Sequence, residues 1–162
     1  MTKRRFAQRE AARRENASRL LRDLWEHGPL SRAQLAARNA LSKATVSAIC
    51  RDLDALELIR EVGESQSGPG RPATLLDIAP QGGCAIGVEI STNYVAVLLA
   101  DLRGEALWQR AVLIPVDSEQ AVILSEVETL VAEACDEAGR RTGGTTDAAA
   151  RVGPLLGIGV GV

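Results

Sequence analysis

Apolar residues recur with helical spacing near the start of the chain. Gly28 and Pro29 follow this segment and are expected to end its helix. We therefore predict an amphipathic helix over residues 16–27. Its buried stripe, with the i, i+3, i+4, i+7, i+8 spacing of such helices, consists of Ala17, Leu20, Leu21, Leu24 and Trp25.

Two shorter helices are predicted next, each opened by a serine. Ser31 can cap a helix that ends near Asn39, and Gln34, three residues after the cap, can complete a capping box. Ser42 can cap another helix that runs to about Glu57. One face of this last helix carries the apolar residues Val46, Ile49, Leu53 and Leu56.

The turn between these two helices, residues 39–41, is short. Such a turn forces a steep crossing of the helices, as in the helix-turn-helix unit. Glycine is usual in this turn, but the chain has Ala40 there. Either Asn39 or Ala40 is therefore expected to take the left-handed backbone conformation.

A hairpin is predicted after the third helix. Residues 58–64 and 73–79 have the pattern of two strands, and the loop between them is rich in glycine and proline. A hairpin in this place is the wing of a winged helix-turn-helix domain. We predict such a domain over residues 16–82, preceded by a basic arm over residues 1–15.

The pattern changes to short alternating strands from residue 83. Strands are predicted over residues 84–91, 94–101 and 105–115, followed by a helix over residues 117–140 and a last strand over residues 155–162. The order is β-β-β-α-β, which predicts a second domain over residues 83–162 and an α+β chain. The helix is expected to bury Leu124, Val127, Val131, Ala134 and Ala138.

Charge divides the chain of 162 residues into two unlike parts. Residues 1–82 hold 14 basic and 10 acidic side chains, whereas residues 83–162 hold 5 and 11. Within the first 22 residues, eight Arg or Lys stand against two Glu. This balance is typical of a segment that faces phosphate, and a solvated, disordered basic tail is the alternative.

The remaining composition narrows the chemistry. His27 is the one histidine, so a multi-histidine metal site is excluded, and no metal and no cofactor are expected. Three cysteines without a CxxC motif indicate free thiols in a reducing compartment, which predicts a cytoplasmic location. The longest apolar stretches are strand-sized, so no membrane partner is expected.

The third predicted helix carries a candidate surface for reading bases. With Val46 and Ile49 turned inward, its first turns expose polar, basic and small side chains. A helix fits the major groove of DNA, where Lys and Arg donate to guanine and methyl groups contact thymine. A plain helical bundle with a polar outer face is the alternative. The predicted base-reading residues are Lys43, Ala44, Thr45, Ser47 and Arg51.

Contacts to phosphate or to the minor groove are predicted for the flanking segments. The tip of the hairpin, Pro-Gly-Arg-Pro, holds an arginine that can enter a narrow minor groove, although an ordinary Gly/Pro-rich loop is the alternative. The residues predicted for these contacts are Arg4, Arg5, Arg14, Ser31, Arg32, Gly70 and Arg71.

Taken together, these motifs resemble the N-terminal portion of ROK-family transcriptional regulators. The resemblance rests on GPLSRAQLA (residues 28–36), LSKATVS (41–47), GRP (70–72), IGVEI (86–90) and DLRG (101–104). It implies a winged helix-turn-helix followed by a partial actin/hexokinase-like (ribonuclease-H-like) domain. It also implies a repressor of sugar-use genes that binds double-stranded DNA at the nucleoid. The complete protein would be a homodimer that responds to a sugar or sugar-derived effector.

The chain departs from the kinase members of that family in two ways. Their first strand leads into a glycine-rich loop that holds ATP phosphate, whereas this chain has side chains that would crowd a phosphate. We interpret the segment as a degenerate phosphate loop. The residues concerned are Glu89, Ser91, Thr92 and Asn93.

The second departure is length. The chain stops before the family's sugar pocket, catalytic aspartate and zinc motif, so we expect a truncated regulator and not an enzyme. A sugar kinase with an N-terminal DNA-binding extension is one alternative. A winged-helix interaction module that does not bind DNA is another.

Overall fold

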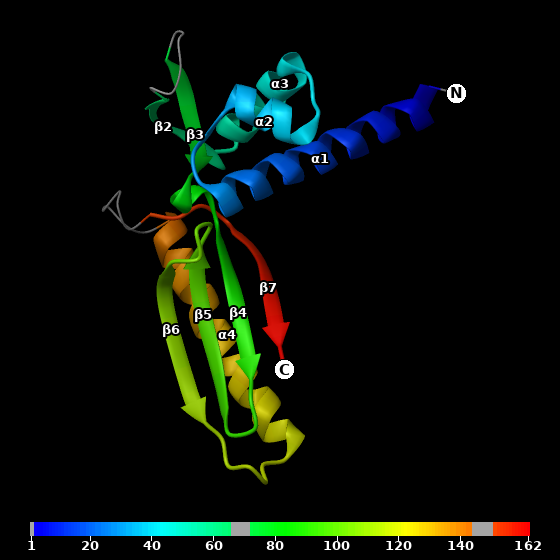
Figure 1. Cartoon of the computed structure of the whole chain (residues 1–162). Coiled ribbons are helices and arrows are strands. Elements are labelled where there is room, and N and C mark those ends of the chain that lie inside the picture. Colours follow the sequence, from blue (N-terminus) through cyan, green and yellow to red (C-terminus); the bar gives the residue numbers. More distant parts are fainter. Residues whose placement is uncertain (1, 66–71, 144–150) are drawn as a thin grey trace. The chain divides into compact units, whose positions relative to one another are not determined.

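A computed structural model describes residues 2–65, 72–143 and 151–162, with side chains from residue 7 onward. The chain divides into two compact units, Met1–Ala79 and Pro80–Val162. Each unit is described by itself, and Figure 1 shows the elements of both. The chain is α+β, as predicted.

The first unit begins with a long helix, α1 (Thr2–His27). The predicted helix began at residue 16, so the prediction missed almost four turns at the start of α1. Residues 7–15 are Ala, Gln, Arg and Glu, all strong helix formers, but they are exposed on every side. A helix without an apolar stripe gives no periodic signal, which is why its first half was read as an arm.

Capping residues place the next two helices as predicted. Gly28, at φ 77°, ends α1 and donates its N–H to the Leu24 carbonyl at 3.1 Å. Helix α2 (Arg32–Asn39) opens with the complete capping box of Ser31 and Gln34. Helix α3 (Lys43–Ala55) opens at Ser42, whose hydroxyl accepts from the Thr45 N–H at 3.1 Å, and it ends two residues before the predicted position.

Ala40 takes the left-handed conformation in the turn between α2 and α3, at φ 52° and ψ 38°. Of the two alternatives, Ala40 is thus the residue that turns the chain. Asn39 stays helical, and its amide donates to the Asp23 carboxylate at 2.6 Å and to the Leu35 carbonyl at 3.0 Å.

Among the described residues of this unit, a three-stranded antiparallel sheet completes the fold. It has the order β1 (Leu30–Ser31), β3 (Ala73–Ile78), β2 (Ile59–Ser65). The register shifts at Glu61/Gly63, where Gly63 has φ 145°. Trp25 is 56% exposed, so its prediction as a core residue was wrong. The largest fully buried side chains of this unit are Leu20, Leu24, Leu35, Val46, Cys50 and Leu76.

The second unit is a mixed sheet covered on one face by a helix. Its strands are β4 (Cys84–Ile90), β5 (Tyr94–Asp101), β6 (Ala106–Leu113) and β7 (Leu155–Gly161), in the order β6-β5-β4-β7. Strand β7 runs parallel to β4, and the other pairs are antiparallel. A short 3-10 turn (Pro80–Gly82) precedes the sheet. The element order agrees with the predicted β-β-β-α-β.

Helix α4 (Gln120–Gly143) lies along the sheet, as Figure 1 shows. Leu130, Ala134 and Ala138 are buried against the strands, with Ile123 and Val127 partly buried beside them. The prediction placed Leu124 in this stripe, but Leu124 is 47% exposed. Ile123 takes its place because it lies four residues before Val127 and seven before Leu130. In the parts of the chain that the structure describes, no helix is both long and apolar enough to cross a bilayer.

Candidate nucleic-acid interface

Helix α3 presents two different faces. Val46, Ile49, Cys50 and Leu53 are buried in the core of the first unit. Lys43, Ser47 and Arg51 are exposed. Because these three lie four residues apart, they form one stripe along the helix. We call Lys43, Ser47 and Arg51 the α3 stripe.

Two other predicted base-reading residues lie off this stripe. Ala44 and Thr45 are exposed but line a groove between α3 and α1. The groove has a volume of about 790 Å³. Its lining from α1 is Arg9, Glu10, Ala12, Arg13 and Asn16, and its lining from α3 is Ala44, Thr45, Ala48 and Ile49.

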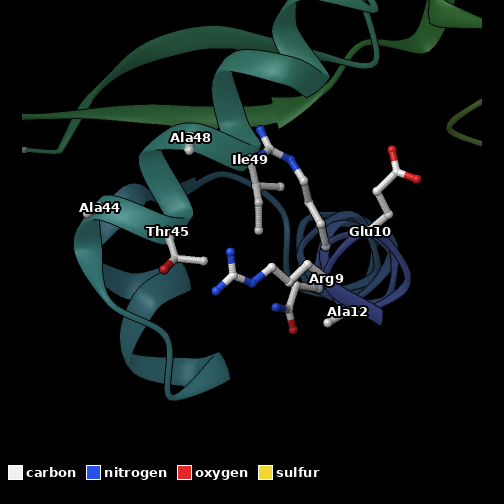
Figure 2. Close-up of a pocket in the computed structure, with 9 residues that line it drawn as sticks. Arg9, Glu10, Ala12, Ala44, Thr45, Ala48 and Ile49 are labelled. Carbon is white, nitrogen blue, oxygen red and sulfur yellow. The ribbon is translucent and has the colours of Figure 1, made fainter. Parts of the chain in front are cut away.

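Figure 2 shows this α1–α3 groove in close-up. Thr45 and Ile49 point from α3 toward α1, and Arg9 lies on the facing side of α1. Glu10 also lines the groove, but its carboxylate points away from Thr45 in Figure 2. The groove therefore brings basic side chains of α1 next to the first turns of α3.

An ion pair joins the two walls of the groove. The Arg13 guanidinium donates to the Asp52 carboxylate, with an Nε to Oδ2 distance of 2.8 Å and a second contact through Nη2. Both side chains are about half exposed, so the pair adds little to stability and is screened by salt. Within the site, the positive charge of Arg13 is therefore balanced by the negative charge of Asp52.

A second polar cluster holds α2 against α1. The Asp23 carboxylate accepts from Arg38 Nε at 3.2 Å and from Asn39 Nδ2 at 2.6 Å. Arg38 Nη2 also lies 2.7 Å from His27 Nε2. Since arginine can only donate, that ring nitrogen is the acceptor. The cluster fixes α2, and through the tight turn it fixes the start of α3.

The predicted phosphate contacts around α2 are engaged within the unit. Ser31 is buried; its hydroxyl accepts from the Gln34 N–H at 3.3 Å, and its own N–H donates to Gln34 Oε1 at 2.8 Å. Arg32 Nη2 lies 3.4 Å from a carboxylate oxygen of Glu61, in an exposed ion pair. Arg14 is exposed on α1. Both polar groups of Ser31 thus serve the helix cap.

Some predicted site residues lie outside what the structure describes. Gly70 and Arg71 are among the undescribed positions of the hairpin loop. Arg4 and Arg5 lie in the first turns of α1, but their side chains are not described.

The predicted degenerate phosphate loop joins β4 to β5. The Ser91 N–H donates to the Tyr94 carbonyl at 2.9 Å, and the Asn93 carbonyl accepts from the Ile114 N–H at 2.8 Å. The Tyr94 hydroxyl donates to Glu89 Oε1 at 2.5 Å, and this hydrogen bond raises the pKa of Tyr94. The Ser91 N–H and the Asn93 carbonyl are thus engaged in backbone hydrogen bonds that hold the β4–β5 turn in place.

Two of the three cysteines, Cys50 and Cys84, are buried, and Cys135 is exposed. Burial raises the pKa of the Cys50 thiol, and the charge of Arg32 offsets this only in part. Burial also raises the pKa of Cys84, so both thiols stay protonated at neutral pH. Within the described residues, no group of three or more His, Cys, Asp or Glu side chains is placed to hold a metal ion.

Sequence reasoning missed the α1 wall of the groove. Arg9, Arg13 and Asn16 are three or four residues apart and share one face of α1. The repeat was present in the sequence, but residues 1–15 were read as a basic arm and only Asn16 was placed in the helix. Extending the helix to the start of the chain would have found it.

No protein-family model matches the chain. The chain is similar to several curated proteins and solved structures, among them the two proteins and the one structure that follow. A suggested xylose repressor of Caldicellulosiruptor sp. strain Rt8B.4 is 30% identical over 143 residues, which is 88% of this chain and 33% of that protein. The DNA-binding transcriptional dual regulator NagC of Escherichia coli K12 is 30% identical over 107 residues, 66% of this chain and 26% of that protein.

The solved structure is a ROK family transcriptional regulator, a homologue of the E. coli MLC protein. It matches 92% of this chain with a TM-score of 0.63 at 24% identity, which supports the fold. The chain is thus similar in fold to a ROK family transcriptional regulator. It spans about a third or less of the length of these relatives, and 35% of the solved chain.

Proposed function

We propose that the first unit is a winged helix-turn-helix domain that binds double-stranded DNA in a sequence-specific way. The observation that carries this proposal is the α3 stripe: Lys43, Ser47 and Arg51 are exposed in one line, on a helix whose other face is buried. The relatives support it, since one is named a DNA-binding regulator and another a suggested repressor. In this proposal the domain covers residues 16–82, with the arm of residues 1–15 ahead of it.

In this mechanism α3 enters the major groove. Lys43 and Arg51 donate to base acceptors such as guanine, and the hydroxyl of Ser47 adapts to either kind of edge. The methyl group of Ala44 is small enough to contact a thymine methyl. Thr45 was predicted to read bases too, but it lies on the side of α3 that faces α1 and lines the groove between them.

Phosphate contacts position the domain and carry no sequence information directly. We assign them to Arg4, Arg5 and Arg14 of α1, and to Arg32, which would exchange its exposed Glu61 partner for a phosphate. Arg71, with Gly70 beside it, is proposed to enter the minor groove. For Ser31 we propose the helix cap as its role in place of a phosphate contact.

For the whole protein we propose a repressor of sugar-use genes and not an enzyme. A xylose-repressor name among the relatives supports the sugar class. Residues 83–162 would form the beginning of a ribonuclease-H-like domain, in which the segment Glu89 and 91–93 does not hold phosphate. The complete protein would act at the nucleoid in the cytoplasm, as a homodimer that responds to a sugar effector.

Selection of duplexes from a random-sequence pool by the 162-residue chain tests the proposal. Binding is then titrated on the selected duplex and on a scrambled duplex at several salt concentrations. We expect Lys43→Ala and Ser47→Ala to weaken binding of the selected duplex by about 1–3 kcal/mol and to change which sequence is selected.

The matched control is Arg14→Ala, which removes one exposed charge from α1. It should weaken both duplexes alike and reduce the salt dependence by about one phosphate contact. Equal losses on both duplexes for Lys43→Ala would contradict the base-reading role. Binding of neither duplex by the unmodified chain would contradict DNA binding itself.

A further inference from the structure

We propose that the α1–α3 groove receives the sugar-phosphate backbone of one DNA strand, with Arg9 as the contact to phosphate and Thr45 facing the same backbone. The inference rests on the proposed DNA-binding function and deepens it. It adds Arg9 to the interface and changes the role of Thr45 from reading bases to holding the backbone.

The position of the groove is the first argument. It lies along the first turns of α3, where Thr45 belongs to the same turn as the α3-stripe residues Lys43 and Ser47. A helix in the major groove is bordered by the two phosphate backbones. A wall of α1 that faces these turns across an open gap is therefore placed to enclose one of those backbones.

Charge is the second argument. The groove holds two arginines, and Arg13 is balanced by Asp52. Arg9 forms no ion pair within the part of the chain that the structure describes, and the carboxylate of Glu10, which also lines the groove, points away from Thr45 in Figure 2. The lining thus holds two arginines and one carboxylate, that of Glu10, and it lies on the most basic segment of the chain. The charge of Arg9 suits a phosphate ester.

The hydrogen bonds of Thr45 are the third argument. Ser42 Oγ accepts from the Thr45 N–H at 3.1 Å and lies 2.8 Å from Thr45 Oγ1. When the Ser42 hydroxyl donates to Thr45 Oγ1, the Thr45 hydroxyl is left to donate into the groove. Ala48 lines the same wall, and its small side chain allows a close approach.

Arg9→Ala tests the inference, with Arg22→Ala as the matched control. Both residues are exposed arginines of α1, but Arg22 does not line the groove. Dissociation constants of the 162-residue chains are measured on a 25-base-pair duplex selected by the unmodified chain and on a scrambled duplex, from 50 to 200 mM salt. Circular dichroism checks that each variant folds.

We expect Arg9→Ala to weaken both duplexes by the same factor, about three- to tenfold at 50 mM salt. The slope of log K against log salt should fall by about one, because one phosphate contact is lost. Arg22→Ala should keep the slope of the unmodified chain. Selection repeated with Thr45→Val should return the same sequence, whereas Ser47→Ala should return another.

Several results would overturn the inference while leaving the proposed function standing. One is an unmodified chain that binds both duplexes with salt dependence while Arg9→Ala keeps its full slope. Others are a changed sequence preference for Thr45→Val, or an effect of Arg9→Ala on sedimentation alone, which would assign the groove to a second copy. If the unmodified chain binds neither duplex, the proposed function fails and the inference fails with it.

Discussion

At the scale of single residues, two non-glycine positions carry the left-handed conformation: within the described residues these are Ala40 and Glu57, at φ 52° and 57°. Both end helices. The N–H of Ala40 reaches back to Ala37, and Leu58 N–H donates to the Leu53 carbonyl at 2.9 Å after α3. These bonds satisfy helix-end carbonyls, and they offset the steric cost of a Cβ atom in that region.

Ala40→Gly should therefore stabilise the first unit by about 1 kcal/mol, because the left-handed region costs an L side chain more than glycine loses in chain entropy. Ala37→Gly is the control, since it puts the same change at an exposed position inside α2, where it should destabilise by about 1 kcal/mol. Urea unfolding by circular dichroism measures both. A loss of stability in Ala40→Gly would contradict the strain.

At the scale of helices and strands, helix caps and buried apolar stripes could be predicted from the sequence. A helical segment without an apolar stripe could not. Ser31, Gln34 and Ser42 mark their helices because the chemistry is local. The first half of α1 was not predicted, because a helix that is exposed on all sides has no stripe of apolar residues. Leu124 was misplaced because Ile123 and Leu124 are adjacent apolar residues, and only packing against the sheet decides which one is buried.

The candidate site divides in the same way. Exposure of the α3 stripe followed from knowing which residues of α3 are apolar. The turning of Thr45 toward Arg9 did not, since it depends on the path of α1. The engagement of Arg32 by Glu61 also joins elements far apart in the sequence, and no local pattern reports it.

The last turns of α4 carry a pH-dependent contribution to stability. Arg140 and Arg141 donate to the Glu137 carboxylate and lower its pKa below the ordinary value of 4.5. A lowered folded-state pKa gives stability that is present above the unfolded pKa and is lost as pH falls through the folded one.

Glu137→Gln should therefore destabilise the second unit at pH 7 and have little effect at pH 2. The difference should be modest, because the ion pair with Arg140 is partly exposed. Glu128→Gln is the control, an exposed carboxylate on the same helix. Urea unfolding followed by Trp108 fluorescence in a Trp25→Phe background measures both. An equal effect of Glu137→Gln at both pH values would contradict the linkage.

At the scale of the whole molecule, each unit has its own core and its own buried thiol. Cys50 lies in the core of the first unit and Cys84 in that of the second. Cys135 is exposed on α4. Strand β7, which pairs with the strand that carries Cys84, is mostly exposed. Chemical labelling of the three thiols therefore reports on two cores and one surface.

In the native chain at pH 8 we expect iodoacetamide to modify Cys135 first. Cys50 and Cys84 should resist, because both are buried and burial raises the pKa of both. As urea increases, Cys84 should become reactive at a lower concentration than Cys50, since the neighbouring strand β7 is mostly exposed and can open locally. Mass spectrometry of the labelled peptides measures each site. Labelling of Cys50 and Cys84 with a single common midpoint would show instead that both cores open in one cooperative step.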